Sequence, residues 1–198
     1  MEENMMHKLY PVIFILFMLS GVWAQSDDWK ADKAHSNIAF SVAHLVISDV
    51  QGKFTDYDVT MTTSKHDLSD ASVEVVIRTA SISTENEKRD KHLRSGDFFN
   101  VEKYPTITFE SKSFEKTGDN KYKVTGDLTM NGVTKEVVLD MIYRGQAKDP
   151  WGNVKAGFKA TTVLDRYDFG LKYNSALETG ALLIGEDVQI NIDLEMEM

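Results

Sequence analysis

The sequence predicts an all-β protein, in which about eight antiparallel strands close into a barrel. Over most of the chain after residue 35, apolar and polar residues alternate with a period of two, as in strands with one buried face. Short turns separate these segments. Asn131-Gly132 is the strongest two-residue hairpin signal, because both positions of a type I′ turn need positive φ. An antiparallel sheet with this many strands removes its exposed edges by closing on itself.

The segments with this strand pattern are, in chain order, residues 35–45, 57–62, 72–78, 106–114, 121–130, 133–144, 154–165 and 187–196. Residues 50–54 lead into the second segment, which Gly52 is expected to bend or bulge. Several segments run near ten residues. With a rise of about 3.3 Å per residue and a tilt of about 40°, they predict a barrel wall about 25 Å tall. Such a deep barrel suits an elongated apolar molecule better than a compact metabolite.

A short, highly charged helix is predicted between the third and fourth strands, within residues 83–105. Thr84 and Glu87 have the spacing of a capping box at its start. Basic residues in the last turn match the helix dipole. Gly96 is expected to take the left-handed conformation that ends the helix. Because this helix interrupts an otherwise all-β chain, a ligand is expected to enter near it.

The N-terminal segment is predicted to be a signal peptide rather than part of the fold. Residues 12–19 form an unbroken apolar run of signal-peptide length, too short to span a bilayer. Val22 and Ala24 are small residues with the spacing that precedes a cleavage site. The predicted organisation is a signal peptide over residues 1–24 and one barrel domain over 25–198. An uncleaved anchor is the alternative; after cleavage no transmembrane anchor is expected.

The composition limits the classes of partner and site. The formal net charge is −9, which argues against nucleic acid and against electrostatic docking on anionic lipid. There is no cysteine, so disulfides, thiol nucleophiles and thiolate metal sites are excluded.

The sequence favours a binding protein over an enzyme. The histidines after residue 24 are His35, His44, His66 and His92, and none is in an HxH or HExxH pattern. A metal site would have to be assembled from distant strands. The chain also has no nucleophile-elbow pattern and no phosphate-cradling glycine loop. We therefore predict no catalytic residues, no metal and no cofactor.

Several motifs, in their order and spacing, carry a family resemblance. They are DxxHSxIxF at 32–40, SIxT at 81–84, RDxHLRSxDFF at 89–99, YPxIxF at 104–109, GDLT at 126–129, GVTK at 132–135 and RxDFG at 166–170. Together they resemble the YceI-like family of exported bacterial polyisoprenoid-binding proteins, over essentially all of residues 28–198. The resemblance implies a lipocalin-like extended barrel whose pore holds a long isoprenoid chain. It also implies a periplasmic or secreted location and no common catalytic activity.

We expect the partner to be a polyisoprenoid lipid or quinone, of polyprenyl phosphate or quinone type, which the protein stores or transports. The candidate ligand-binding residues lie on the aligned apolar faces, at the end of the first strand and just after the helix. They are Ile38, Phe40, Val42, His44, Val75, Ile77, Phe98, Phe99, Ile107, Phe109, Leu128, Phe158, Ile190 and Ile192. The alternative is that these side chains fill the barrel, and that the protein acts through its surface as a stress-related or adaptor protein. His44 is also open to interpretation as a hydrogen-bonded core histidine.

Basic residues near the helix and near residue 170 are candidates for contact with a ligand head group. They are Arg89, His92, Arg94 and Arg166. Arginine suits phosphate because its planar guanidinium makes paired hydrogen bonds. The alternative is that they pair with neighbouring groups and hold the helix over the barrel, as Glu85 and Arg89 would at a spacing of four residues.

Two further alternatives remain open at this point. An outer-membrane barrel also has strands that alternate over about ten residues, but it would turn the apolar face to lipid and bury many charges in a narrow lumen. A homodimer is compatible with the sequence as well.

Overall fold

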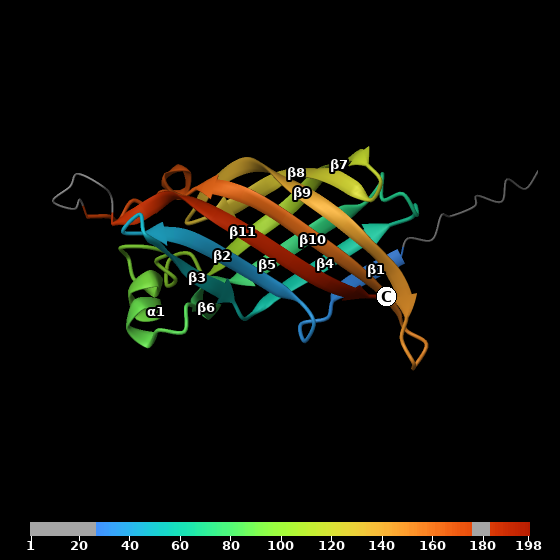
Figure 1. Cartoon of the computed structure of the whole chain (residues 1–198), viewed down its shortest axis with the longest axis horizontal. Helices are drawn as coiled ribbons and strands as arrows, with labels where there is room; N and C mark the ends of the chain where they lie inside the picture. The colour runs from blue at the N-terminus through green and yellow to red at the C-terminus, as the bar shows by residue number, and fades with distance from the viewer. Residues whose placement is uncertain (1–26, 176–182) are drawn as a thin grey trace, which may run out of the picture.

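The computed structural model describes residues 27–175 and 183–198, and most of them lie in strands (Figure 1). The strands are β1 (Asp27–Ala31), β2 (Asn37–His44), β3 (Ser48–Phe54), β4 (Tyr57–Thr63), β5 (Ser72–Arg78), β6 (Ile82–Ser83), β7 (Thr106–Gly118), β8 (Lys121–Met130), β9 (Val133–Lys148), β10 (Val154–Asp165) and β11 (Ile184–Glu197). The α-helix is α1 (Glu87–Arg94), and two 3₁₀ turns span Thr79–Ser81 and Arg166–Phe169. Among the helices of these residues, none is both long and apolar enough to cross a membrane. The predicted signal peptide, residues 1–24, lies outside the described residues.

Eight antiparallel strands form a closed ring, as the sequence predicts. The order is β1-β4-β5-β7-β8-β9-β10-β11, and β1 pairs with β11 to complete the ring. Figure 1 shows the ribbons winding obliquely around a long barrel, with α1 at one end. The helix lies between the strands predicted as third and fourth, 72–78 and 106–114, which confirms its predicted place.

The structure corrects the composition of this ring. The predicted first strand, β2, pairs with β11 over Ile184 to Asp193, and the unpredicted β1 continues along the same edge of β11 at Met196 and Glu197. The alternation of apolar and polar residues did not predict β1, because Trp29 is its only large apolar residue among charged neighbours. β2, β3 and β6 together extend the sheet beyond the ring at the α1 end.

The predicted bent strand over residues 50–62 is wrong, because β3 and β4 are separate strands with different neighbours. β3 pairs with β2 and β6, whereas β4 pairs with β1 and β5. Phe54 and Tyr57 are both buried, while the two residues between them are exposed. That spacing breaks the period of two, so the chain turns there.

Both predicted caps of α1 are wrong, although its basic last turn is present. Asn86 is the N-cap: its side-chain oxygen accepts from the backbone N–H of Arg89 at 3.0 Å. Thr84 does not cap, because its backbone N–H and hydroxyl both donate to the buried carboxylate of Asp90. The helix ends at Ser95 in extended conformation, and Gly96 is not among the residues with positive φ.

The apolar faces of the strands point into the barrel, and charges lie outside. Lys112 on β7 pairs with Asp127 at 2.5 Å and with Glu136 at 3.1 Å, and Lys123 pairs with Asp140 at 2.9 Å. These pairs run across the outer face of β7, β8 and β9. This is the reverse of the arrangement that an outer-membrane barrel requires.

An ion cluster lies where the ring closes. Lys155 of β10 places its Nζ 2.7 Å from a carboxylate oxygen of Glu197 and 3.0 Å from one of Asp32, just after β1. His35 Nδ1 lies 3.0 Å from the same Asp32 oxygen. Hydrogen bonds from His35 and Lys155 hold the pKa of Asp32 well below its usual range, and the bond to Asp32 raises the pKa of His35 above its ordinary 6.5. The cluster therefore ties β1 and β2 to β10 and β11.

We call the place where β1 and β11 close the ring the seam. We expect His35→Gln to remove a pH dependence of stability that the ion cluster gives to this seam. A raised histidine pKa contributes stability that is complete below the unfolded pKa of 6.5 and is lost as pH rises through the folded value. The melting temperature of the wild type should therefore fall relative to that of His35→Gln as pH increases from 6 to 8. A difference in melting temperature that stays constant over this range would contradict the assignment. The depressed pKa of Asp32 acts in a separate, acidic window, below its unfolded value of 3.8.

We expect Gly126→Ala to destabilise the barrel, because the ring of Phe109 packs directly on this glycine. An added Cβ would lie 2.5 Å from both Phe109 Cζ and the backbone oxygen of Glu110. The cost of such overpacking is about 1–3 kcal/mol in the free energy of unfolding, measured by urea denaturation. The control is Gly96→Ala, where an added Cβ meets no atom of the described residues within 4 Å. Equal stability of the two variants would contradict this packing.

Candidate functional site

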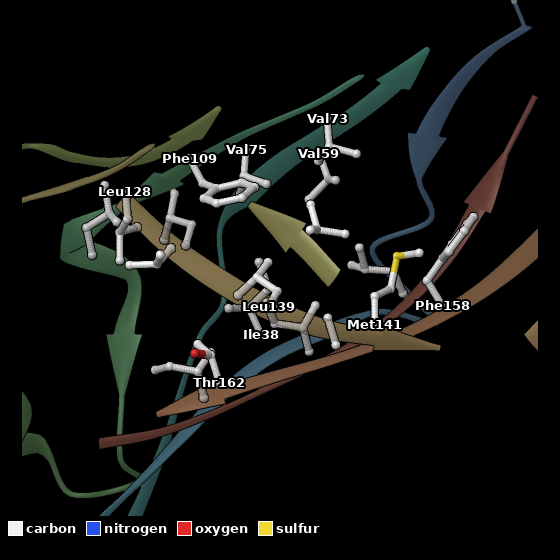
Figure 2. A pocket seen from close by; sticks show the side chains of 18 of the residues that line it. Ile38, Val59, Val73, Val75, Phe109, Leu128, Leu139, Met141, Phe158 and Thr162 are labelled. Carbon is white, nitrogen blue, oxygen red and sulfur yellow. The ribbon is translucent and has the colours of Figure 1, made fainter. Parts of the chain in front are cut away.

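The barrel encloses an apolar cavity of about 150 Å³. Figure 2 shows side chains from opposite walls facing each other across it: Val73, Val75 and Phe109 on one side, and Leu139, Met141 and Ile38 on the other. Among the described residues that line it, Thr162 alone carries a polar side chain. The complete lining is Ile38, Ala39, Phe40, Phe54, Val59, Met61, Val73, Val75, Ile77, Ile107, Phe109, Phe114, Val124, Leu128, Met130, Val137, Leu139, Met141, Phe158, Ala160, Thr162, Leu164, Ile190, Ile192, Leu194 and Met196.

The period of two on each strand builds this lining. On β9, Leu139 and Met141 point into the cavity, while Val138 and Ile142 are each 43% exposed on the outer face. Successive side chains of a strand point to opposite faces, so a shift of one residue would turn the polar face inward.

The structure places most of the predicted ligand-binding residues in this cavity. They are Ile38, Phe40, Val75, Ile77, Ile107, Phe109, Leu128, Phe158, Ile190 and Ile192. Val42, His44 and Phe98 line a different space, described below, and Phe99 packs with its ring edge against Phe54 at 6.1 Å.

Sequence reasoning missed the methionines of the lining and the inner face of β9. The methionines are Met61, Met130, Met141 and Met196, and β9 adds Val137 and Leu139. The alternation of Val137, Leu139 and Met141 with Val138 and Asp140 was a sufficient signal for β9. The missed methionines give the cavity flexible walls, because their unbranched side chains fill irregular spaces.

A second apolar space lies under α1, and we call it the antechamber. It holds about 270 Å³ and is lined by Phe40, Val42, His44, Val50, Arg89, His92, Leu93, Phe98, Tyr173, Leu183 and Ile184. His92 makes edge-to-face contacts with Phe98 at 5.0 Å and with Tyr173 at 4.8 Å between ring centroids. The antechamber is therefore built from the ends of β2 and β11 and from the helix and its following turn.

A polar groove of about 600 Å³ lies beside it, along β2, β3 and the segment before α1. Asn37, Asp49, Gln51 and Lys53 contribute to its walls, and Arg89 borders both the groove and the antechamber. A polar end of an amphipathic ligand would find hydrogen-bonding groups here, next to an apolar space.

Arg89 and His92 are the predicted head-group residues that border these spaces. The Arg89 guanidinium donates through Nε to Thr84 Oγ1 at 2.7 Å and through Nη2 to the Thr84 carbonyl at 3.0 Å. His92 Nε2 lies 3.0 Å from a carboxylate oxygen of Asp97. Both side chains thus contact neighbours of their own segment, as predicted by the alternative in which they pair with neighbouring groups. Both also remain at the rim of an apolar space.

Arg94 and Arg166 serve local structure instead. Arg94 donates to the carbonyls of Ala80 and Ile82, each at 2.7 Å. Arg166 is only 4% exposed and donates to several backbone carbonyls, including those of Tyr173 at 3.0 Å and Gly185 at 2.8 Å. Neither side chain lines the cavity, the antechamber or the groove. We therefore do not retain these two residues as head-group contacts.

Three potential metal ligands also converge from distant parts of the chain. Asp32, His35 and Glu195 place ligand atoms within 4.8 Å of one another. The Lys155 ammonium lies 3.0 Å from Asp32 and 3.6 Å from Glu195. This cation balances the carboxylates, so the group is explained as the ion cluster of the seam.

We expect Arg166→Lys to lower the free energy of unfolding by at least about 2 kcal/mol. The reason is that one ammonium group cannot make the several hydrogen bonds that the buried guanidinium donates to backbone carbonyls. Arg144 is exposed on β9, so Arg144→Lys is a matched control with an expected change within about 0.5 kcal/mol. Urea denaturation of the two variants measures this difference. Similar values for both would show that the Arg166 contacts contribute little.

Comparison with known proteins agrees with this architecture. The YceI-like domain family matches residues 29–196. A UPF0312 protein of Pseudomonas aeruginosa is 45% identical over 151 residues, which cover 75% of this chain and 78% of that protein.

Solved structures show the same barrel. A YCEI protein of Campylobacter jejuni has 38% identity and a TM-score of 0.67, and the match covers 84% of this chain and 95% of that one. A domain from Saccharophagus degradans, described as a polyisoprenoid binding domain implicated in plant cell wall breakdown, has a TM-score of 0.64. Its match covers 85% of this chain and 97% of that one, and its 16% identity supports the fold alone.

Proposed function

Because this chain belongs to the YceI-like family, we propose that it binds a long-chain isoprenoid lipid inside the barrel and stores or transports it. The ligand class is a polyprenyl phosphate or an isoprenoid quinone. The observation that carries the proposal is the apolar lining of a closed barrel, with Thr162 as its single polar side chain among the described residues. The name of the Saccharophagus degradans domain, which has the same fold, supports the same ligand class.

The size of the cavity sets a condition on this proposal. A void of about 150 Å³ holds a molecule of roughly the size of benzene, and therefore about one five-carbon isoprene unit. A long chain needs the lining to move. The methionines Met61, Met130, Met141 and Met196 come from four strands and supply side chains that rearrange at low cost. Ligand binding is thus proposed to widen the cavity along the barrel.

The proposed role is binding without catalysis. An apolar lining holds a chain through burial, at about 0.8 kcal/mol per methylene group, and offers no acid, base or nucleophile among the described residues other than one threonine hydroxyl. Since each methylene contributes about equally, chain length is sensed by where the space ends rather than by a particular contact.

We also propose export to the periplasm or the exterior, on the basis of the predicted signal peptide. Native mass spectrometry of protein purified from its own host tests export and binding together. The expected spectrum has a polypeptide that begins at Gln25 and carries an added mass that organic extraction identifies as an isoprenoid lipid. The same spectrum reports whether the protein is a homodimer. A bare polypeptide mass with no lipid in the extract would contradict the binding proposal.

The alternative is a barrel whose side chains nearly fill it and whose surface carries the function. The small volume of the cavity favours this alternative. It predicts that added isoprenoid alcohol neither binds nor raises the melting temperature.

Leu139→Asn tests whether the interior holds the ligand. The amide would face the apolar cavity without a partner, so affinity for an isoprenoid alcohol such as geranylgeraniol should fall by about tenfold or more. The adjacent Val138 lies on the outer face, so Val138→Asn is the matched control and should bind like the wild type. Equal affinities of the two variants, in a titration of each folded protein, would place the ligand outside the barrel.

A further inference from the structure

Three successive inward residues of β2 trace a path from the cavity to the antechamber. Ile38 lines the cavity and Val42 lines the antechamber. Phe40, between them, lines the cavity, the antechamber and the polar groove. Its side chain is therefore the boundary at which all three spaces meet.

The ring of Phe40 packs directly on the backbone of a glycine, in space that any side chain at that position would occupy. Gly52 is its cross-strand partner on β3, and an added Cβ there would lie 2.3 Å from Phe40 Cζ and 2.9 Å from the methyl carbon of Thr84. On the cavity side, Phe54 lies 6.0 Å away between ring centroids. One side of the ring thus contacts the backbone of Gly52, so side chains do not enclose the ring on every side.

The frame around this ring is held by buried polar contacts. Thr84 donates its backbone N–H to Asp90 at 2.8 Å and its hydroxyl to the same carboxylate oxygen at 2.5 Å, and it accepts from Arg89 at 2.7 Å. Asp90 is buried in α1. The helix therefore fixes the wall next to Phe40, while Phe40 itself is only partly buried.

We infer that the antechamber under α1 is a binding compartment through which an apolar chain enters the barrel, and that Phe40 is the gate between the two. This inference rests on the proposed function. Rotation of the ring away from Gly52 joins the antechamber of about 270 Å³ to the cavity of about 150 Å³. A chain then passes between two spaces whose walls are mostly apolar.

The opposite end of the barrel is less suited to an apolar chain. The space there, of about 170 Å³, has polar groups from Thr63, Lys65, His66 and Gln146 in its walls. Trp29, 5% exposed, also forms part of it. The α1 end, where Figure 1 shows the helix beside β3 and β6, is therefore assigned as the entrance.

The test measures uptake and release of all-trans-retinol, a fluorescent isoprenoid alcohol, by stopped flow with phosphatidylcholine vesicles as the acceptor. Removing a gate accelerates both directions, whereas removing an ordinary ligand contact accelerates release only. We expect Phe40→Ala to raise both rate constants by about tenfold or more while the dissociation constant changes much less. Ile38→Ala, two residues along the same face, removes a cavity contact without removing the gate. It should accelerate release but leave the uptake rate within about twofold of the wild type.

Gly52→Ala provides a second variant that keeps the phenyl ring. Its Cβ displaces the ring from its place, so uptake should again be faster than in the wild type. Melting curves confirm that each variant is folded. If uptake by folded Phe40→Ala or Gly52→Ala matches that by Ile38→Ala, the gate is overturned while binding stands. If the wild type takes up no retinol, both the gate and the proposed function are overturned.

Discussion

The closure of the sheet between β1 and β11 is the constraint on which the rest of this structure depends. Within the described part of the chain, the two strands share only the pairs Lys30 with Glu197 and Ala31 with Met196. The ion cluster around Lys155, together with Ser36 donating to the Glu195 carbonyl at 3.2 Å, reinforces this short seam. Closure shields a continuous apolar face from water and leaves charged pairs outside. Without it, the inner faces of eight strands would form an exposed apolar sheet.

The same edge of β11 also accounts for the different strand arrangement at the α1 end of the barrel. β11 pairs with β1 at its C-terminal end and with β2 along the rest of its length. β2 then pairs with β3, and β3 with β6, instead of closing the ring. The antechamber lies at this extension of the sheet, between the ends of β2 and β11 and the helix. The short helical insertion thus distinguishes this end of the barrel, where we infer the entrance, from the other end.

The sequence predicted the barrel and much of its lining because both depend on a local, repeated signal. Alternation identified Phe109 and Ile190 on inner faces without any knowledge of their partners. It could not identify β1, where one tryptophan among charges is buried by distant strands. It also could not identify the burial of Arg166, whose acceptors Tyr173 and Gly185 lie far apart in the sequence. The prediction of the α1 N-cap was wrong for a related reason. Thr84 has the right local spacing, but tertiary contact with Asp90 determines its hydrogen bonds.

The most direct test of an interior ligand uses the methionine methyl groups as reporters in isotope-filtered NMR. Met61, Met130, Met141 and Met196 line the cavity, whereas Met198 is 53% exposed at the end of the chain. With geranylgeraniol added to protein labelled with ¹³C at its methionine methyls, we predict nuclear Overhauser contacts from the chain to the four cavity methyls and none to Met198. Contacts to Met198 alone, or to none of the five, would contradict an isoprenoid-binding interior.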